Sequence, residues 1–219
     1  MENVAKIFTG NSINEKIKQE KYFGKTDGLT YIATKNVGFD NKIDYDTKIK
    51  IPESENFKVA PKNTTLLCIE GGSAGKKIGF TNQPVCFVNK LCAFVGNETN
   101  SKLIYFFMQT DFFLNQFNAK KHGLIGGVSI KDLSEIIFPL PPLDEQKKIV
   151  ERIERLFSKL DSAKKKFRQF WTATNFDAPQ FCTKHLPENL PKISALKIIY
   201  RWTAGKKFVL IKSQILKAI

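Results

Sequence analysis

A glycine-rich segment with two lysines, residues 71–77, is the first candidate for a chemical role. It reads Gly-Gly-Ser-Ala-Gly-Lys-Lys and lies between two short apolar runs. A phosphate-binding P-loop needs glycine five residues before the Gly-Lys pair and serine or threonine after it, but Glu70 and Lys77 stand there. We therefore exclude nucleotide hydrolysis at this segment. Its backbone N–H groups and lysines suit close approach to a nucleic-acid backbone, and an unliganded hairpin tip is the alternative.

Other polar segments are also candidates for contact with nucleic acid. Lysine can meet a phosphate or a guanine, and asparagine can make paired hydrogen bonds to an adenine edge. A second glycine and lysine loop covers residues 119–127, and its His122 fits a contact role better than catalysis. For each residue taken singly, a solvated turn is the alternative. The predicted DNA-contacting residues are Lys35, Asn36, Lys62, Asn63, Gly72, Ser73, Lys76, Lys77, Lys120, Lys121, His122 and Gly123. We expect the Lys35–Asn36 turn and the two glycine loops to line one cleft.

No set of residues predicts catalysis or a metal site. The sequence has no Asn-Pro-Pro-Tyr-type methyltransferase motif and no carboxylate–lysine cluster typical of nucleases. Cys182 and His185 form an isolated Cys-x-x-His without a second pair, so they do not predict a zinc site. Cys68, Cys86 and Cys92 lie in apolar runs and are predicted to be buried thiols. We therefore predict no catalytic residue, no metal site and no cofactor bound by this chain.

The charge of the chain favours a polyanionic partner, most simply nucleic acid. The formal net charge is +14. Residues 1–143 carry 18 lysines, no arginine and 14 acidic residues, whereas residues 144–170 carry nine basic and five acidic residues. Any recognition surface in the first part is therefore mixed and local rather than uniformly basic.

The elements expected to position these residues are short strands followed by helices. Apolar and β-branched runs predict strands at residues 28–34, 66–70, 78–80, 85–88 and 91–95. A helix is predicted over residues 103–117, where the phenylalanines follow helical spacing and are expected to be core rather than base-stacking residues. Ser129 is predicted to cap a short helix, with Asp132 completing a pair that resembles a capping box.

The longest predicted element is a helix over residues 144–170. Prolines precede it, and Asp144 is predicted to be its N-cap. Its apolar positions alternate in steps of four and three, the heptad pattern of a helix that packs against one partner helix. An ordinary amphipathic helix lying on its own domain is the alternative. The predicted helix-pairing residues are Ile149, Ile153, Leu156, Leu160 and Phe167.

Together these patterns predict an α+β fold, with a mixed β-sheet domain followed by a long coiled-coil-forming helix. The expected domains are residues 1–143, the helix at 144–170, and an unassigned tail at 171–219. The sequence shows no signal peptide and no run of about 18 apolar residues, so we expect a soluble, cytoplasmic protein without a membrane partner.

Residues 139–150 read Pro-Leu-Pro-Pro-Leu-Asp-Glu-Gln-Lys-Lys-Ile-Val. This block and the heptad helix that follows it resemble the specificity (S) subunits of type I restriction–modification systems. Upstream matches occur in the same order at residues 9–10, 28–32, 71–76 and 126–129, so the resemblance covers about residues 1–168. A complete S subunit has two recognition domains and two helices, and this chain resembles one half of it. The family's tryptophan-containing opening is absent, and no family pattern is found from Phe170 onward.

The resemblance implies that residues 1–143 are a DNA target recognition domain that reads one half of a bipartite site in double-stranded DNA. It implies that the helix is a dimerisation and spacer element that pairs with a second copy or with another half S subunit. Methylation (M) and restriction (R) subunits would carry the chemistry, using S-adenosylmethionine, ATP and magnesium, so the chain itself is not expected to be an enzyme. The alternatives are a small nuclease with Glu70 and Asp132 as candidate acids, and a coiled-coil adaptor whose charge serves only solvation.

Overall fold

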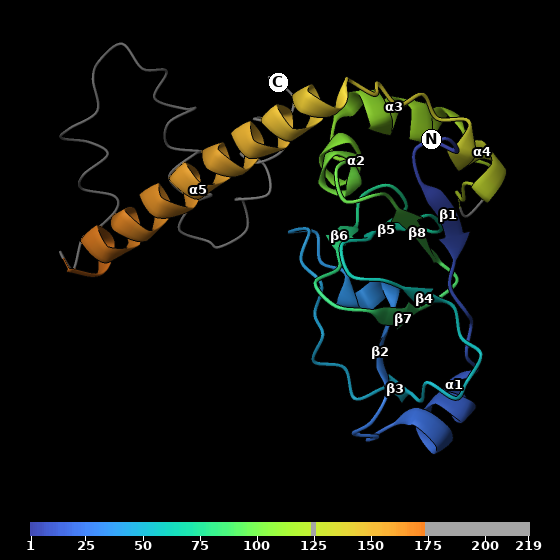
Figure 1. Cartoon of the computed structure of the whole chain (residues 1–219). Helices are drawn as coiled ribbons and strands as arrows, with labels where there is room; N and C mark the ends of the chain where they lie inside the picture. The colour runs from blue at the N-terminus through green and yellow to red at the C-terminus, as the bar shows by residue number, and fades with distance from the viewer. Residues whose placement is uncertain (124–125, 174–219) are drawn as a thin grey trace, which may run out of the picture. The chain divides into compact units, whose positions relative to one another are not determined.

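The structure is a computed structural model that describes residues 1–123 and 126–173 (Figure 1). The described residues divide into two compact units, residues 1–147 and residues 148–173, and each is described by itself. In chain order the described elements are β1 (Lys6–Thr9), α1 (Glu15–Ile17), the π-helical turn η1 (Lys18–Tyr22), β2 (Leu29–Ile32), the 3-10 turn η2 (Thr34–Asn36), β3 (Lys50–Ile51), β4 (Val59–Ala60), β5 (Thr65–Cys68), β6 (Ile78–Phe80), β7 (Val85–Phe87), β8 (Leu91–Val95), α2 (Ser101–Phe107), α3 (Asp111–Ala119), α4 (Ile130–Ser134) and α5 (Leu143–Ala173).

Two four-stranded sheets form the frame of the first unit. The first sheet has the order β1-β8-β5-β6 and is antiparallel throughout. The second has the order β3-β2-β7-β4, in which β2 and β7 are parallel and Thr30 pairs with Val85. The mixture of helices with both antiparallel and parallel strand pairs gives an α+β fold, as the sequence predicts.

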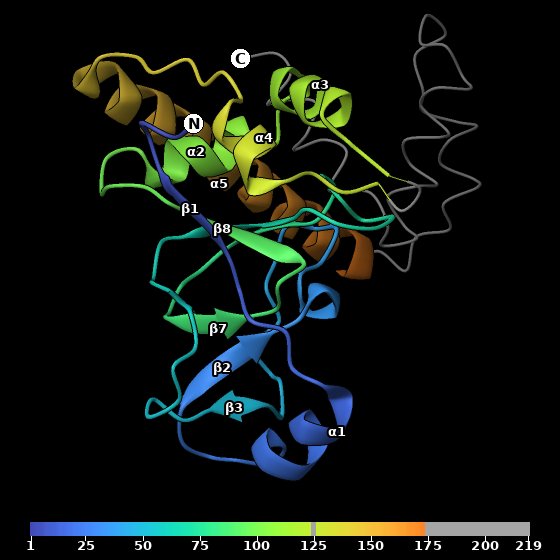
Figure 2. The same ribbon diagram turned by 90° about the vertical axis from the view of Figure 1, so that its right-hand side faces the viewer.

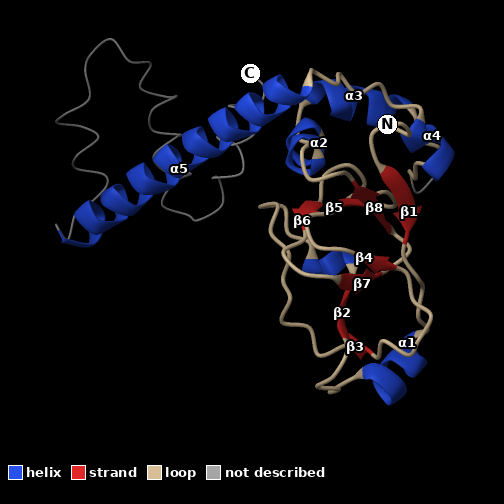
Figure 3. Cartoon of the chain, viewed as in Figure 1, coloured by secondary structure: helices blue, strands red, loops and turns tan. Residues whose placement is uncertain are grey.

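The first unit is layered, with helices α2, α3 and α4 over one face of the first sheet and the second sheet on its other face (Figures 1 and 3). The view turned by 90° shows the same order of layers (Figure 2). Leu67 of β5 packs with Phe113 and Phe117 of α3, whereas its neighbour Leu66 packs with Phe87 between the sheets. All four residues of β5 are buried because both faces of the strand are covered, which explains its continuous apolar run.

The helix predicted over residues 103–117 is wrong as a single element. The structure has α2 and α3 there, separated at Met108–Thr110. The Thr110 hydroxyl donates to the Phe107 carbonyl oxygen at 2.7 Å and accepts from the Phe113 N–H at 3.3 Å, so it closes one helix and caps the next. The prediction that these phenylalanines are core residues is confirmed, since Phe107, Phe113 and Phe117 are buried.

The short helix α4 is capped as predicted. The Ser129 hydroxyl accepts from the Asp132 N–H at 3.1 Å and donates to its carboxylate at 2.5 Å. The three cysteines predicted to be buried thiols are free and buried, and burial raises the pKa of Cys92 to about 12. Burial also raises the pKa of Cys86, to about 11. Both thiols are therefore core groups.

The long helix α5 begins at Leu143, and the backbone N–H groups of Glu145 and Gln146 donate to the Pro142 carbonyl oxygen at 2.9 and 3.0 Å. Asp144 therefore lies inside the first turn, and its predicted place at the N-cap is wrong. Gln146 is buried, and its Nε2 donates to the Pro141 carbonyl oxygen at 2.8 Å. This hydrogen bond fixes the turn by which the proline-rich segment enters the helix.

No helix in the described part of the chain is both long enough and apolar enough to cross a bilayer. The same residues contain no group of three or more His, Cys, Asp and Glu side chains that could hold a metal ion.

Candidate nucleic-acid interface

The two glycine loops predicted to contact DNA lie next to each other. Glu70, at the start of the first loop, forms an antiparallel bridge with Gly127, at the end of the second. The Val128 N–H donates to the Ile69 carbonyl oxygen at 3.0 Å, which continues this pairing by one residue. Gly127 also pairs with His122 and so closes the second loop on itself. Backbone hydrogen bonds therefore join two segments that are far apart in the sequence.

The first glycine loop is a packed turn. The N–H groups of Ala74, Gly75 and Lys76 donate to carbonyl oxygens of Gly71, Cys68 and Ser73 at 2.8–3.0 Å. A Cβ atom at Gly75 would lie 2.8 Å from the Phe117 ring, so a side chain has no room there. These three N–H groups are used within the loop and are not available to a phosphate. A phosphate contact here would therefore come from the lysine side chains or from the N–H groups of Gly72 and Ser73 at the tip.

A lysine at the end of the first loop connects it to the predicted Lys35–Asn36 turn. The Lys77 ammonium donates to the Thr34 carbonyl oxygen at 3.0 Å. Lys35 is exposed in that turn, whereas Asn36 is only 9% exposed and its Oδ1 accepts from the Ala33 N–H at 3.1 Å. The Asn36 side chain thus stabilises its own turn, so we do not include it in the proposed DNA surface.

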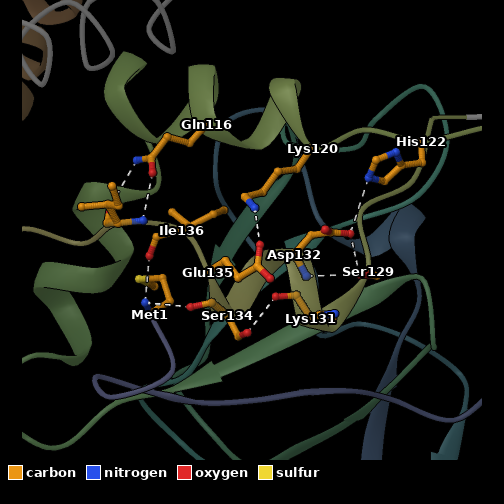
Figure 4. Close-up of polar contacts among 11 residues, drawn as sticks. Met1, Gln116, Lys120, His122, Ser129, Lys131, Asp132, Ser134, Glu135 and Ile136 are labelled. Atoms are coloured by element: carbon orange, nitrogen blue, oxygen red, sulfur yellow. Dashed lines mark hydrogen bonds and ion pairs between the residues drawn. The ribbon is translucent and has the colours of Figure 1, made fainter.

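The second loop carries cations that already have partners (Figure 4). The Lys120 ammonium lies 2.7 Å from the Glu135 carboxylate, and the Lys121 ammonium lies 5.4 Å from the centroid of the Phe117 ring. His122 is exposed, and its Nε2 lies 3.7 Å from Oδ2 of Asp132. The Ser129 hydroxyl, and to a lesser extent His122, hold the pKa of Asp132 below its usual value. Lys120 is therefore the least available of these groups for a phosphate.

Hydrogen bonds on both sides hold the segment that follows this loop (Figure 4). The Met1 ammonium donates to the carbonyl oxygens of Ser134 and Ile136 at 3.1 and 2.8 Å, and burial lowers its pKa. On the other side, Oε1 of Gln116 accepts from the Ile137 N–H at 2.8 Å, and its Nε2 donates to the Ile137 carbonyl oxygen at 3.1 Å. These contacts fix α4, and with it the side chains of Ser129 and Asp132.

Lys62 and Asn63 lie apart from the other predicted contact residues. They precede β5, and the Asn63 N–H donates to the carbonyl oxygen of Thr81, which follows β6. The first glycine loop instead joins the end of β5 to the start of β6. In an antiparallel hairpin these positions are opposite ends, so the structure separates Lys62 and Asn63 from Lys76 and Lys77.

We use the name basic loop cluster for Lys35, Lys76, Lys77, Lys121 and His122, which lie on the three joined segments. Gly72, Ser73 and Gly123 belong to the same loops, and Gly72 and Gly123 have open space where a Cβ would be added. The loop at residues 37–43 lies beside this cluster and was not among the predicted contact segments. Its Gly-Phe-Asp-Asn run is typical of a tight turn and was the available signal.

A family model described as the type I restriction modification DNA specificity domain matches residues 1–169. The type I restriction enzyme EcoBI specificity subunit of Escherichia coli is 26% identical over 170 residues, 77% of this chain and 34% of that protein. The EcoKI specificity subunit of Escherichia coli (strain K12) is 26% identical over 168 residues, 72% of this chain and 35% of that protein. The chain spans about a third of the length of these curated relatives.

Solved structures share the fold. A chain from a study of complex assembly and conformational transition of the type I R-M system aligns with a TM-score of 0.58 and 20% identity, covering 78% of this chain and 40% of that one. The crystal structure of the HsdS subunit from Thermoanaerobacter tengcongensis aligns with a TM-score of 0.55 and 17% identity, covering 85% of this chain and 48% of that one. Because the family model also covers well over half of the sequence, the chain belongs to the type I restriction modification DNA specificity domain family.

Proposed function

We propose that this chain is the sequence-reading subunit of a type I restriction–modification complex, and that its first unit reads one half of a bipartite site in double-stranded DNA. The observation that carries the proposal is the joining of three basic segments, each picked out separately in the sequence, by hydrogen bonds at Lys77 and Val128. Lysines on adjacent loops are suited to phosphates, and polar or apolar side chains between them are suited to base edges.

The helix α5 is proposed to pair antiparallel with the same helix of a second copy or of another half S subunit. Within the second unit, Ile153 is buried, while Ile149, Leu156 and Leu160 are partly exposed between charged positions such as Glu151. Phe167 also belongs to the predicted seam but lies outside the described side chains. Pairing of two helices would set the distance between half-sites, as protein symmetry does in other dimeric DNA readers.

The chemistry is proposed to belong to partner subunits. A methylation (M) subunit would use S-adenosylmethionine, and a restriction (R) subunit would use ATP and magnesium, while this chain binds no cofactor of its own. The chain would position both partners on DNA by holding the target sequence. The proposed domain roles are therefore DNA target recognition for residues 1–143 and dimerisation and spacing for residues 144–170.

Co-purification tests this assignment. The full chain is expected to co-purify with the methylation and restriction subunits encoded beside it, and the complex is expected to retain one duplex sequence over others at raised salt. A chain that binds neither subunit, and whose behaviour does not depend on salt, would instead support the coiled-coil adaptor. Cleavage of DNA by the purified chain, abolished by Glu70→Gln or Asp132→Asn, would support the nuclease alternative.

A further inference from the structure

Phe39 is an exposed aromatic side chain beside the basic loop cluster. Its side chain is 55% exposed, whereas the phenylalanines of α3 at positions 113 and 117 are fully buried. It lies in the loop between η2 and β3, directly after the Lys35 turn. A single exposed apolar residue is common on protein surfaces, so the case for a binding role rests on the contacts that hold this loop and its ring.

The loop that carries Phe39 is anchored on both sides. Val37 and Ile43 form an antiparallel bridge across its base, and the Gly38 N–H donates to the Lys42 carbonyl oxygen at 2.9 Å. At the tip, Asn41 has a φ of 63°, and its Nδ2 donates to Oε1 of Gln109 at 2.7 Å. A tip held in this way presents its side chain at little further entropic cost on binding.

One face of the Phe39 ring is covered by a cation. The Lys77 ammonium lies over the ring, 5.1 Å from its centroid, while it also donates to the Thr34 carbonyl oxygen at 3.0 Å. A ring that wedges between two base pairs must present both of its faces, and here one is occupied. The ring therefore offers its other face and its edge, next to a fixed positive charge.

We propose that Phe39 makes an apolar contact with the 5-methyl group of one thymine in the major groove, so that it specifies that base. The inference rests on the proposed reading of double-stranded DNA by the first unit. Among the four bases only thymine presents a methyl group on its major-groove edge, and a phenylalanine edge has no hydrogen-bonding atom to offer the others. Lys77 adds positive charge beside the ring, which favours approach to the duplex.

The test removes this one methyl group from DNA. A duplex is first enriched from a randomised pool by the full chain, and each thymine is then replaced in turn by deoxyuridine. Replacement at one position is expected to weaken binding by wild type about fourfold, the value of one buried carbon. Phe39→Ala is expected to bind the thymine and deoxyuridine duplexes equally at that position, and Phe39→Leu is expected to keep part of the difference.

Phe23 provides the matched control. It is 48% exposed, and the Lys48 ammonium lies 5.7 Å from the centroid of its ring. Phe23→Ala removes a similar exposed ring and a similar cation contact, and it should keep the wild-type response to deoxyuridine. Thermal unfolding of every variant shows whether its fold is intact.

Three results would overturn the inference. An enriched site without thymine, or a Phe39→Ala variant that keeps the full wild-type response to deoxyuridine, refutes the role of Phe39 while sequence-specific binding stands. Failure to enrich any duplex from the pool overturns both this inference and the proposed function.

Discussion

Replacement of Lys76 by methionine tests whether the first glycine loop contacts the DNA backbone. Lys76 is exposed, and its backbone N–H donates to the Ser73 carbonyl oxygen at 3.0 Å, a bond that the substitution leaves in place. Methionine keeps most of the length of the side chain and removes its charge. The change should therefore alter DNA binding without altering the fold.

The expected magnitude follows from counterion release. Each phosphate contact contributes about 0.9 to the slope of log affinity against log salt concentration for duplex DNA. Loss of one contact means that, between 50 and 200 mM salt, the affinity of Lys76→Met should fall about 3.5-fold less than that of wild type. At the low end of that range the variant should bind more weakly, because it releases fewer counterions.

Fluorescence anisotropy with one labelled duplex at several salt concentrations measures these slopes. Lys62→Met is the matched control, since it removes the same charge at the opposite end of the β5–β6 hairpin and should keep the wild-type slope. A Lys76→Met slope equal to that of wild type would refute the contact. Equal changes in both variants would show that only the net charge of the chain matters.

Three further predictions concern packing, thiol chemistry and helix pairing. A Cβ atom at Gly10 would overlap the backbone carbonyl of Phe87. Gly10→Ala should therefore lower the free energy of unfolding, measured in urea, by about 1–3 kcal/mol. An unchanged midpoint would contradict this packing. Burial raises the pKa of Cys92 to about 12, so iodoacetamide at pH 8 should label this thiol only after unfolding. Mass spectrometry of the peptide that contains Cys92 measures the labelling. Labelling of the native chain would contradict the burial of Cys92. If α5 pairs with another helix, the double variant Leu156→Lys and Leu160→Lys should sediment as a smaller species than wild type. An unchanged sedimentation coefficient would refute pairing through these residues.

Two strands of the first sheet, β6 and β8, could be predicted with the right bounds from local patterns, whereas β1 was not among the predicted strands. β8 matches the predicted residues 91–95 and ends directly before Gly96, and β6 matches the predicted residues 78–80, with Asn82 two residues beyond its end. β3 and β4 could not be predicted in this way. Each has only two residues, and each exists because a longer strand, β2 or β7, lies beside it in space.

The division of the predicted helix shows the limit of periodicity. Apolar spacing continues through residues 103–117, but the Thr110 side chain competes for backbone groups and starts a new helix. At Asn36 a similar local hydrogen bond uses the oxygen that the sequence analysis assigned to an adenine edge. In both cases a short polar side chain bonds to its own backbone, which spacing alone does not reveal.

The loops of the candidate site could be chosen from the sequence, but their arrangement could not. Glycine and lysine mark residues 71–77 and 119–127 as candidates, whereas the bridge between Glu70 and Gly127 depends on the packing of the first sheet against α3 and α4. The DNA-contacting roles of these residues remain predictions. Phe39 was missed because one aromatic residue in a turn has no periodic pattern to mark it.

The most direct test of the central claim is methylation-site mapping on genomic DNA from cells that carry the methylation subunit with and without this chain. The account predicts that methylation at one split sequence appears only when the chain is present, and that Phe39→Ala changes the preference at a single thymine within one half of it. Methylation at the same sites in the absence of the chain would contradict its role as the subunit that reads DNA.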